Sequence, residues 1–251
     1  MSVEAVTGGL STGAREYLLA FADDEHLMGQ QHTEWIGVAP FLEEDLAFCS
    51  IAQDELGHAA ALYELVGDPD WLAFGRGGDE YRSCHLVEMP CPDWADALAR
   101  HWLYDLAESH RWSALAGSSV PAVAAAVARA EREETYHRRH AHALVQRMVT
   151  SSVGDAADRV HDAVARLLPL ADAIWEPVAG EADAAATGVV TATSAELRSQ
   201  WRPEVEAVIG PVDWAGLTVV DQARRTRRTL HFAPLHARIN EVYALDPTAR
   251  W

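Results

Sequence analysis

Apolar residues recur along most of the chain at intervals of three and four, the period of an amphipathic helix, and the alternation typical of a strand is nearly absent. Ser11 or Thr12 is a suitable cap for the first such segment, Pro40 follows its end, and Gly67 closes the second. We therefore predict an all-α protein with helices at about 11–38, 41–66, 94–116, 121–150, 155–178, 194–208 and 218–244.

The segments between these helices predict how the chain is connected. Residues 67–93 are rich in Gly, Pro and Asp and indicate a long connection, whereas "GSSVP" at 117–121 is a short break. The stretch from 11 to 150 thus repeats a helix–turn–helix unit on either side of a long crossover. This is the layout of a ferritin-like four-helix bundle. We expect a single domain over 1–251, with further helices from about 155 to 244 packed around the bundle.

Composition restricts the kinds of partner. The chain has 251 residues and a formal charge of −18, which argues against a nucleic acid or an anionic membrane as the main partner. No run of about eighteen uncharged apolar residues occurs, so we expect a cytoplasmic protein. Three cysteines without a CxxC pair indicate neither a disulfide framework nor a zinc site. The basic run "RRTRR" at 224–228 fits a solvated helix end better than a site for an anion such as a coenzyme A phosphate.

Two Glu-x-x-His steps stand out within the predicted bundle. "QDELGH" contains Glu55 and His58, and "EETYH" contains Glu134 and His137. Residues three apart on a helix lie on one face, so both side chains of a step reach the same place. With 38 acidic residues and 12 histidines one such step arises easily by chance, so the positions of the steps decide their meaning.

Each step has a carboxylate at a matching height on the preceding helix. Pro40, at the first turn, lies midway in sequence between Glu25 and Glu55. Position 119, at the centre of the second turn, lies midway between Glu134 and the residue just before Asp105. Positions equally far from a turn lie at about the same height in an antiparallel helix pair, so Glu25 and Asp105 are the expected partners of the two steps. Glu108, one turn further on the same face, is an open alternative to Asp105.

Four carboxylates and two imidazoles from four helices are the ligand set of carboxylate-bridged dinuclear proteins. Two divalent cations would cancel the charge of four buried carboxylates, and oxygen and imidazole ligands suit iron or manganese. Glu133 lacks the spacing to His137 and is not expected to be a ligand, whereas Asp54 is a candidate partner for a ligating imidazole. The predicted metal ligands are Glu25, Glu55, His58, Asp105, Glu134 and His137. We expect His26, His32 and Glu34 to be surface or outer groups.

Three separated blocks of the sequence resemble one known family. They are "GQQHTEWIGVAPFLEEDLAF", "LAFGRGGDEYRSCHLVEMPCPDWADALARHWLYD" and "LHFAPLHARINEVYALDPTARW". The chain resembles the PaaA/PaaC proteins of the bacterial ring 1,2-phenylacetyl-CoA epoxidase over nearly its whole length. The long connection at 67–93 and the terminal Trp251 resemble the C-type subunit more than the A-type subunit.

The resemblance implies a function as well as a fold. In that family the A-type subunit holds a di-iron centre, and C-type subunits have generally lost the ligands that this sequence retains. It implies two iron ions, with manganese as an alternative, and O2 activation that oxygenates an aromatic or acyl substrate, such as a CoA thioester. Expected partners are a separate reductase and either a second copy or an A-type subunit. A non-catalytic subunit and an iron-storage protein are the alternatives.

Overall fold

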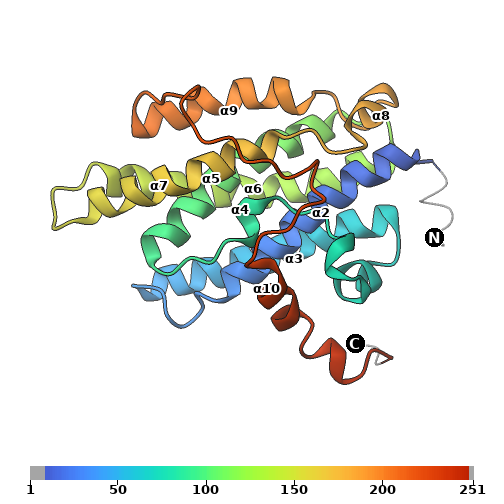
Figure 1. The fold of residues 1–251 in the computed structure, drawn as a ribbon, viewed down its shortest axis with the longest axis horizontal. Coiled ribbons are helices and arrows are strands. Elements are labelled where there is room, and N and C mark those ends of the chain that lie inside the picture. The colour runs from blue at the N-terminus through green and yellow to red at the C-terminus, as the bar shows by residue number, and fades with distance from the viewer. Residues whose placement is uncertain (1–8, 249–251) are drawn as a thin grey trace.

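A computed structural model describes residues 9–248, and within these residues every regular element is a helix (Figure 1). The prediction of an all-α bundle is therefore confirmed. Trp251, one of the residues behind the resemblance, lies outside the described part. The four long helices of the bundle are α2 (Thr12–Thr33), α3 (Leu42–Val66), α5 (Trp94–Ala116) and α6 (Pro121–Val149).

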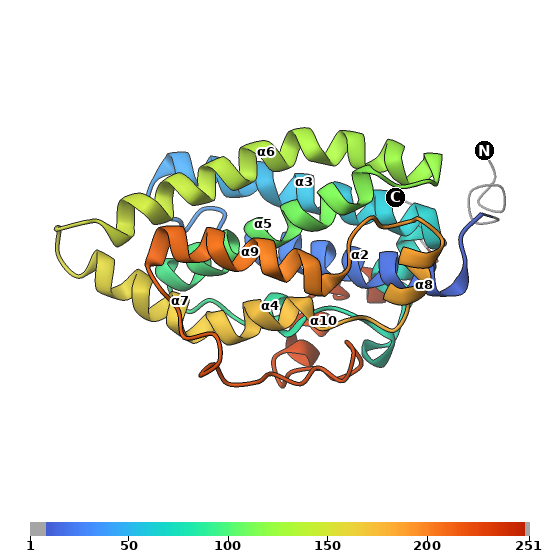
Figure 2. The ribbon, with the colours of Figure 1, turned by 90° about the horizontal axis from the view of Figure 1, so that it is seen from above.

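The bundle is covered unevenly by the later helices. α2 packs on α3, α5 packs on α6, and α3 also contacts α6. α7 (Ala156–Asp172) and α9 (Ser194–Ile209) both pack on α5, while α8 (Glu181–Ala186) packs on α2. Figure 2 shows α3 and α6 along one edge of the molecule and α7 and α10 (Phe232–Ile239) along the opposite edge. Most of α5 is consequently buried, whereas α6 buries one stripe of side chains and exposes the rest.

The helix ends follow local chemistry. The Ser11 side chain accepts a hydrogen bond from the Ala14 amide at 3.2 Å and caps α2. α2 ends at Thr33, before the predicted end at 38, and turns follow in which Gly37 has a φ of 84°. Glycine adopts this left-handed conformation without steric cost, so the bend between α2 and α3 falls here.

The predicted long connection at 67–93 contains three short helical turns: η1 (Trp71–Gly75), η2 (Gly78–Glu80) and α4 (His85–Glu88). Two successive aspartates of α2 hold it in place. Asp23 accepts hydrogen bonds from the Arg76 guanidinium, and Asp24 accepts one from the Cys84 amide. The crossover is thus attached to the helix that also contains Glu25.

The predicted helix at 218–244 is wrong. Helix is confined to α10 and the short turn η4 (Tyr243–Leu245), and residues 210–231, here called the C-terminal strap, contain no helix. Ala223, Arg224 and Arg225 have φ angles of 48°, 54° and 69°. Left-handed conformations cost roughly 1–2 kcal/mol for each non-glycine residue, so other interactions must hold the strap in this form.

The basic run within the strap supplies those interactions. Arg225 is buried, and its Nη1 lies 2.9 Å from both carboxylate oxygens of Asp24. Arg228 donates to Glu88 Oε1 at 2.6 Å. The expectation of a solvated helix end is therefore wrong, because two of these arginines neutralise acidic groups of the same chain. Separately, no helix among residues 9–248 is long and apolar enough to cross a membrane.

Candidate metal centre

The two Glu-x-x-His steps meet at mid-bundle, one from α3 and one from α6. His58 Nδ1 lies 3.1 Å from Glu134 Oε1, which belongs to the other step. His137 Nδ1 lies 3.3 Å from Glu134 Oε1 and 3.9 Å from Glu55 Oε1. All four side chains are buried. The helical spacing read from the sequence therefore brings both steps to one place.

One glutamate from each remaining bundle helix joins them. On α2, the Oε2 atom of Glu25 lies 3.5 Å from His58 Nδ1. Two groups result, and within each the candidate ligand atoms lie within 4.8 Å of one another. The first is Glu25, Glu55, His58 and Glu134, and the second is Glu55, Glu108, Glu134 and His137. Both groups include Glu55 and Glu134, so they are two overlapping candidate positions for a metal ion, with two carboxylates in common.

Glu108 occupies the place for which Asp105 was predicted. Asp105 is buried but belongs to neither group, and its Oδ1 lies 3.0 Å from His101 Nδ1. The helix ends explain the difference, because Glu25 and Glu108 lie equally far before the last residues of α2 and α5, at positions 33 and 116. Asp105 lies almost one helical turn further from the end of α5.

The outer nitrogen of each imidazole contacts the acidic residue that directly precedes the opposite step. His58 Nε2 lies 2.9 Å from Glu133 Oε2, and His137 Nε2 lies 3.1 Å from Asp54 Oδ2. Such a contact fixes the ring and its tautomer, leaving Nδ1 directed at the carboxylates. The sequence suggests Asp54 for this role, whereas the equivalent role of Glu133 is not evident from its spacing.

Burial and crowding change the protonation of these groups. Burial, and then the nearby charges of Glu25 and Glu134, raise the pKa of Glu55 well above its ordinary value. Burial and Glu134 likewise raise the pKa of Glu108. Burial alone would lower the pKa of His58, but contacts with Glu134 and Glu25 raise it to about 10.

The same balance holds on the other side of the cluster. Burial opposes the charged form of His137, but Asp54 and Glu134 raise its pKa to about 9. Burial also opposes ionisation of Glu134, yet its contacts with Glu108, His137 and His58 lower its pKa. In the metal-free cluster, protons on the carboxyl groups and on the two imidazoles therefore offset the negative charge of the buried carboxylates.

The donor set fits a pair of divalent transition-metal ions. Several buried donor atoms have no hydrogen-bond partner: Glu25 Oε2, His58 Nδ1, His137 Nδ1 and both carboxylate oxygens of Glu55, Glu108 and Glu134. Unpartnered buried polar atoms are rare in native proteins and call for an unplaced ligand or ion. Oxygen and imidazole donors without thiolates suit iron or manganese.

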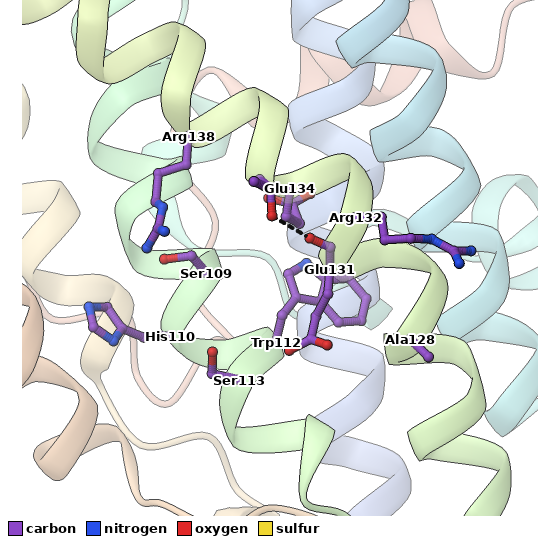
Figure 3. Close-up of a pocket in the computed structure, with 10 residues that line it drawn as sticks. Ser109, His110, Trp112, Ser113, Ala128, Glu131, Arg132, Glu134 and Arg138 are labelled. Carbon is purple, nitrogen blue, oxygen red and sulfur yellow. Dashed lines mark hydrogen bonds between the residues drawn. The ribbon is translucent and has the colours of Figure 1, made fainter.

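A cavity of about 500 Å³ between α5 and α6 reaches the cluster. Glu134 and Trp112 line it from the bundle side, and Arg132 and Arg138 flank it (Figure 3). Trp112 also packs against His58, with ring centroids 5.4 Å apart. Nothing in the sequence pattern distinguishes these lining residues from ordinary core and surface positions.

The remaining groups near Glu25 lie in different environments. His26 is buried against Phe74, with ring centroids 5.4 Å apart, and burial lowers its pKa to about 3. His32 is buried beside His101, at 4.9 Å between centroids. Glu34 forms an ion pair with Arg238. Neither histidine is therefore a surface group.

Fold and site together define a ferritin-like helical protein with a candidate dinuclear metal centre. The chain belongs to the PaaA/PaaC family, described as phenylacetic acid catabolic proteins, which matches residues 6–251. It is 31% identical over 248 residues to the C-type subunit of 1,2-phenylacetyl-CoA epoxidase from Escherichia coli strain K12, and the alignment covers 94% of this chain and 98% of that protein. The predicted family resemblance is confirmed.

Proposed function

We propose that this chain is a di-iron oxygenase component of the phenylacetyl-CoA epoxidase family, and not only a structural subunit. The observation that supports it is the pair of overlapping four-residue groups with unpartnered buried donor atoms. A purely structural bundle gains nothing from burying four carboxylates, because each costs several kcal/mol without a counter-charge.

The proposal gives each residue of the cluster a role. Glu25 and His58 would hold one ion, Glu108 and His137 the other, and Glu55 and Glu134 both. Bound iron would supply the redox chemistry that activates O2. Glu133 and Asp54 orient the two imidazoles, and the packed ring of Trp112 keeps bulk water away from the His58 side.

The cavity supports an aromatic or acyl substrate that also has anionic groups. Trp112 and Ala128 offer apolar surface in the cavity that Glu134 lines, and Arg132 and Arg138 offer cationic groups on either side of it. A CoA thioester combines these properties. Because the relative is named for phenylacetyl-CoA, this compound is the first substrate to test.

The proposed activity also needs other proteins. Electrons would come from a separate reductase, and the chain would act as a homodimer or with an A-type subunit. The relative is itself named as one subunit of an epoxidase, which supports an assembly over a solitary chain.

The decisive experiment combines metal analysis with turnover. Protein expressed in iron-replete cells, or reconstituted anaerobically with Fe(II), should contain close to two ions per chain and consume O2 rapidly when reduced. With a reductase and phenylacetyl-CoA it should yield an oxygenated product. Less than one ion per chain after reconstitution would refute the metal centre, and O2 uptake that yields only ferric mineral would indicate iron storage.

A non-catalytic subunit is the second candidate, favoured by the full-length similarity to the C-type chain of the epoxidase. Glu55→Ala distinguishes the two, because it removes a ligand shared by both groups. If the chain is catalytic, this variant loses turnover. If it serves only to stabilise an A-type partner, the variant supports that partner as well as the wild type does.

A further inference from the structure

The two candidate metal positions are equivalent in their helices but not in their hydrogen bonds. Glu25 and Glu108 lie equally far from the ends of α2 and α5. Four residues before each, one turn away on the same face, is an aromatic residue: Phe21 before Glu25 and Tyr104 before Glu108. Only one of these two rings has a hydroxyl group, so the repeat is broken at this point.

That hydroxyl contacts the other helix. Tyr104 donates a hydrogen bond to Glu25 Oε1 at 2.6 Å, and both side chains are fully buried. Glu25 Oε2 has no hydrogen-bond partner and faces His58 Nδ1. One carboxylate oxygen of Glu25 is thus occupied, and the other is left for an ion.

Glu108 has no tyrosine partner: its side-chain contact is with Glu134 inside the cluster, and neither of its carboxylate oxygens accepts a hydrogen bond from a group outside it. Phe21, the counterpart of Tyr104, instead packs its ring against Trp112, with centroids 4.6 Å apart. The Arg111 guanidinium also lies over the Phe21 ring, 3.8 Å from its centroid. The two glutamates therefore differ in their hydrogen bonds, because only Glu25 is held by a tyrosine hydroxyl, although the two match in position along their helices.

We propose that Tyr104 is a positioning residue that makes the two metal positions unequal. It holds Glu25 so that only Oε2 is offered to the ion shared with His58, and this position binds its ion more tightly than that of Glu108 and His137. The inference rests on the proposed metal centre. A preorganised ligand loses less conformational entropy on binding, and outer hydrogen bonds of this kind typically change metal affinity by about 10–100-fold.

Tyr104→Phe tests the inference, with Tyr63→Phe as a matched control. Tyr63 is also buried and donates to a carboxylate of α2, Asp23 Oδ1 at 2.7 Å, but this carboxylate belongs to neither metal group. Both variants remove one buried hydroxyl, and because that of Tyr63 also accepts a hydrogen bond from Arg76, Tyr63→Phe should lose at least as much stability. Only Tyr104→Phe should change metal binding.

The probe is Mn(II), added stepwise to metal-free protein and followed by electron paramagnetic resonance. In the wild type the first equivalent should give the signal of isolated Mn(II), which weakens as the second ion couples to it. Anomalous scattering from crystals with one equivalent should place that ion beside Glu25 and His58. In Tyr104→Phe the affinity of this position for Mn(II) should fall about 10–100-fold, and the first ion should bind at Glu108 and His137 instead.

The other outcomes are equally informative. A Tyr104→Phe isotherm that matches those of the wild type and Tyr63→Phe overturns the inference while leaving the metal centre intact. Equal weakening of both positions also overturns it, because a general loss of structure would then explain the effect. Absence of Mn(II) binding in the wild type refutes the metal centre itself.

Discussion

Three consecutive acidic residues of α2 are fully buried, yet their surroundings differ completely. Asp23 is paired with Arg76, and Asp24 with Arg111 and Arg225. Glu25, the next residue, lies among three other glutamates, and its nearest basic group is an imidazole.

The protonation of the two regions reflects this contrast. Burial opposes the charge of Asp24, but Arg225 and Arg111 outweigh it and lower the pKa of that carboxyl. In the cluster, burial and mutual repulsion raise the pKa of Glu55 and of Glu108. The chain neutralises the first region by itself and leaves the second to be neutralised by protons or by metal.

The largest expected effect comes from removing a shared ligand. Glu134→Ala should reduce the metal content from two ions per chain to less than one, because Glu134 belongs to both groups. Glu108→Gln and Asp105→Asn sharpen the result: the first should lose one ion and the second should keep both. Metal analysis after Fe(II) reconstitution measures this, and loss of an ion from Asp105→Asn alone would restore the ligand prediction made from the sequence.

The next largest effect separates the two regions in metal-free protein. Asp24→Asn leaves Arg111 and Arg225 buried without their counter-charge and should lower the free energy of unfolding by about 3–5 kcal/mol. Glu55→Gln should cost far less, because burial and the neighbouring carboxylates raise the pKa of Glu55 and so already favour its neutral form. Urea unfolding of the two variants provides the measurement. Equal costs would contradict the contrast between the regions.

The pH dependence of the metal-free protein should show the same contrast. Glu55 and Glu108, with pKa values raised above 4.5, contribute stability at low pH that is lost as the pH rises. His58 and His137 act in the same direction: their contribution is complete below 6.5 and is lost as the pH rises through about 10 and about 9. The midpoint temperature of thermal unfolding should therefore decrease as the pH is raised from neutral to alkaline.

Metal should change this profile, since bound ions replace the protons and their binding strengthens as ligands deprotonate. The contribution of Asp24 to stability depends on pH in the opposite direction. Its pKa is lowered below 3.8, so this contribution is lost only as the pH falls through that lowered value. A metal-free midpoint that rises from neutral to alkaline pH would contradict the assignment of raised pKa values to the cluster.

The smallest effects concern the outer contacts. Glu133→Gln should weaken metal binding about 10–100-fold, because Glu133 orients His58. Arg129→Ala is the control: its ion pair with Glu133 has a 3.7 Å separation, the arginine side chain is 72% exposed, and the pair should be worth no more than about 1 kcal/mol. Metal titration of both variants tests the difference, and similar affinities would remove Glu133 from the site.

The sequence predicted the bundle and most of the cluster because both depend on helical spacing. Glu55 with His58, and Glu134 with His137, need only the three-residue step. The choice of Asp105 over Glu108 depended on the turn, which the sequence does not define well. The loop between α2 and α3 spans 34–41, whereas the loop between α5 and α6 spans only 117–120, so counting from loop positions shifted the register.

The strap could not be predicted in the same way. Residues 218–231 contain neither Gly nor Pro and so do not exclude a helix, but Arg225 pairs with Asp24 across 201 residues of sequence. Tertiary charge pairing overrides local preference there, and the left-handed run at Ala223 to Arg225 follows from it. The cavity beside Trp112 also depends on how α5 and α6 pack, which no local pattern records.

The pairing of Asp24 with Arg225 has a consequence for the order of events during synthesis. Arg225 is synthesised 201 residues after Asp24, so the helix that contains Glu25 receives this counter-charge only after all four helices of the bundle have been made. Contacts this distant in sequence close late and slow the final folding step. The nascent bundle can therefore assemble its helices early, but the charge of Asp24, beside its acidic cluster, is fully balanced only once the strap has been made and has packed against α2.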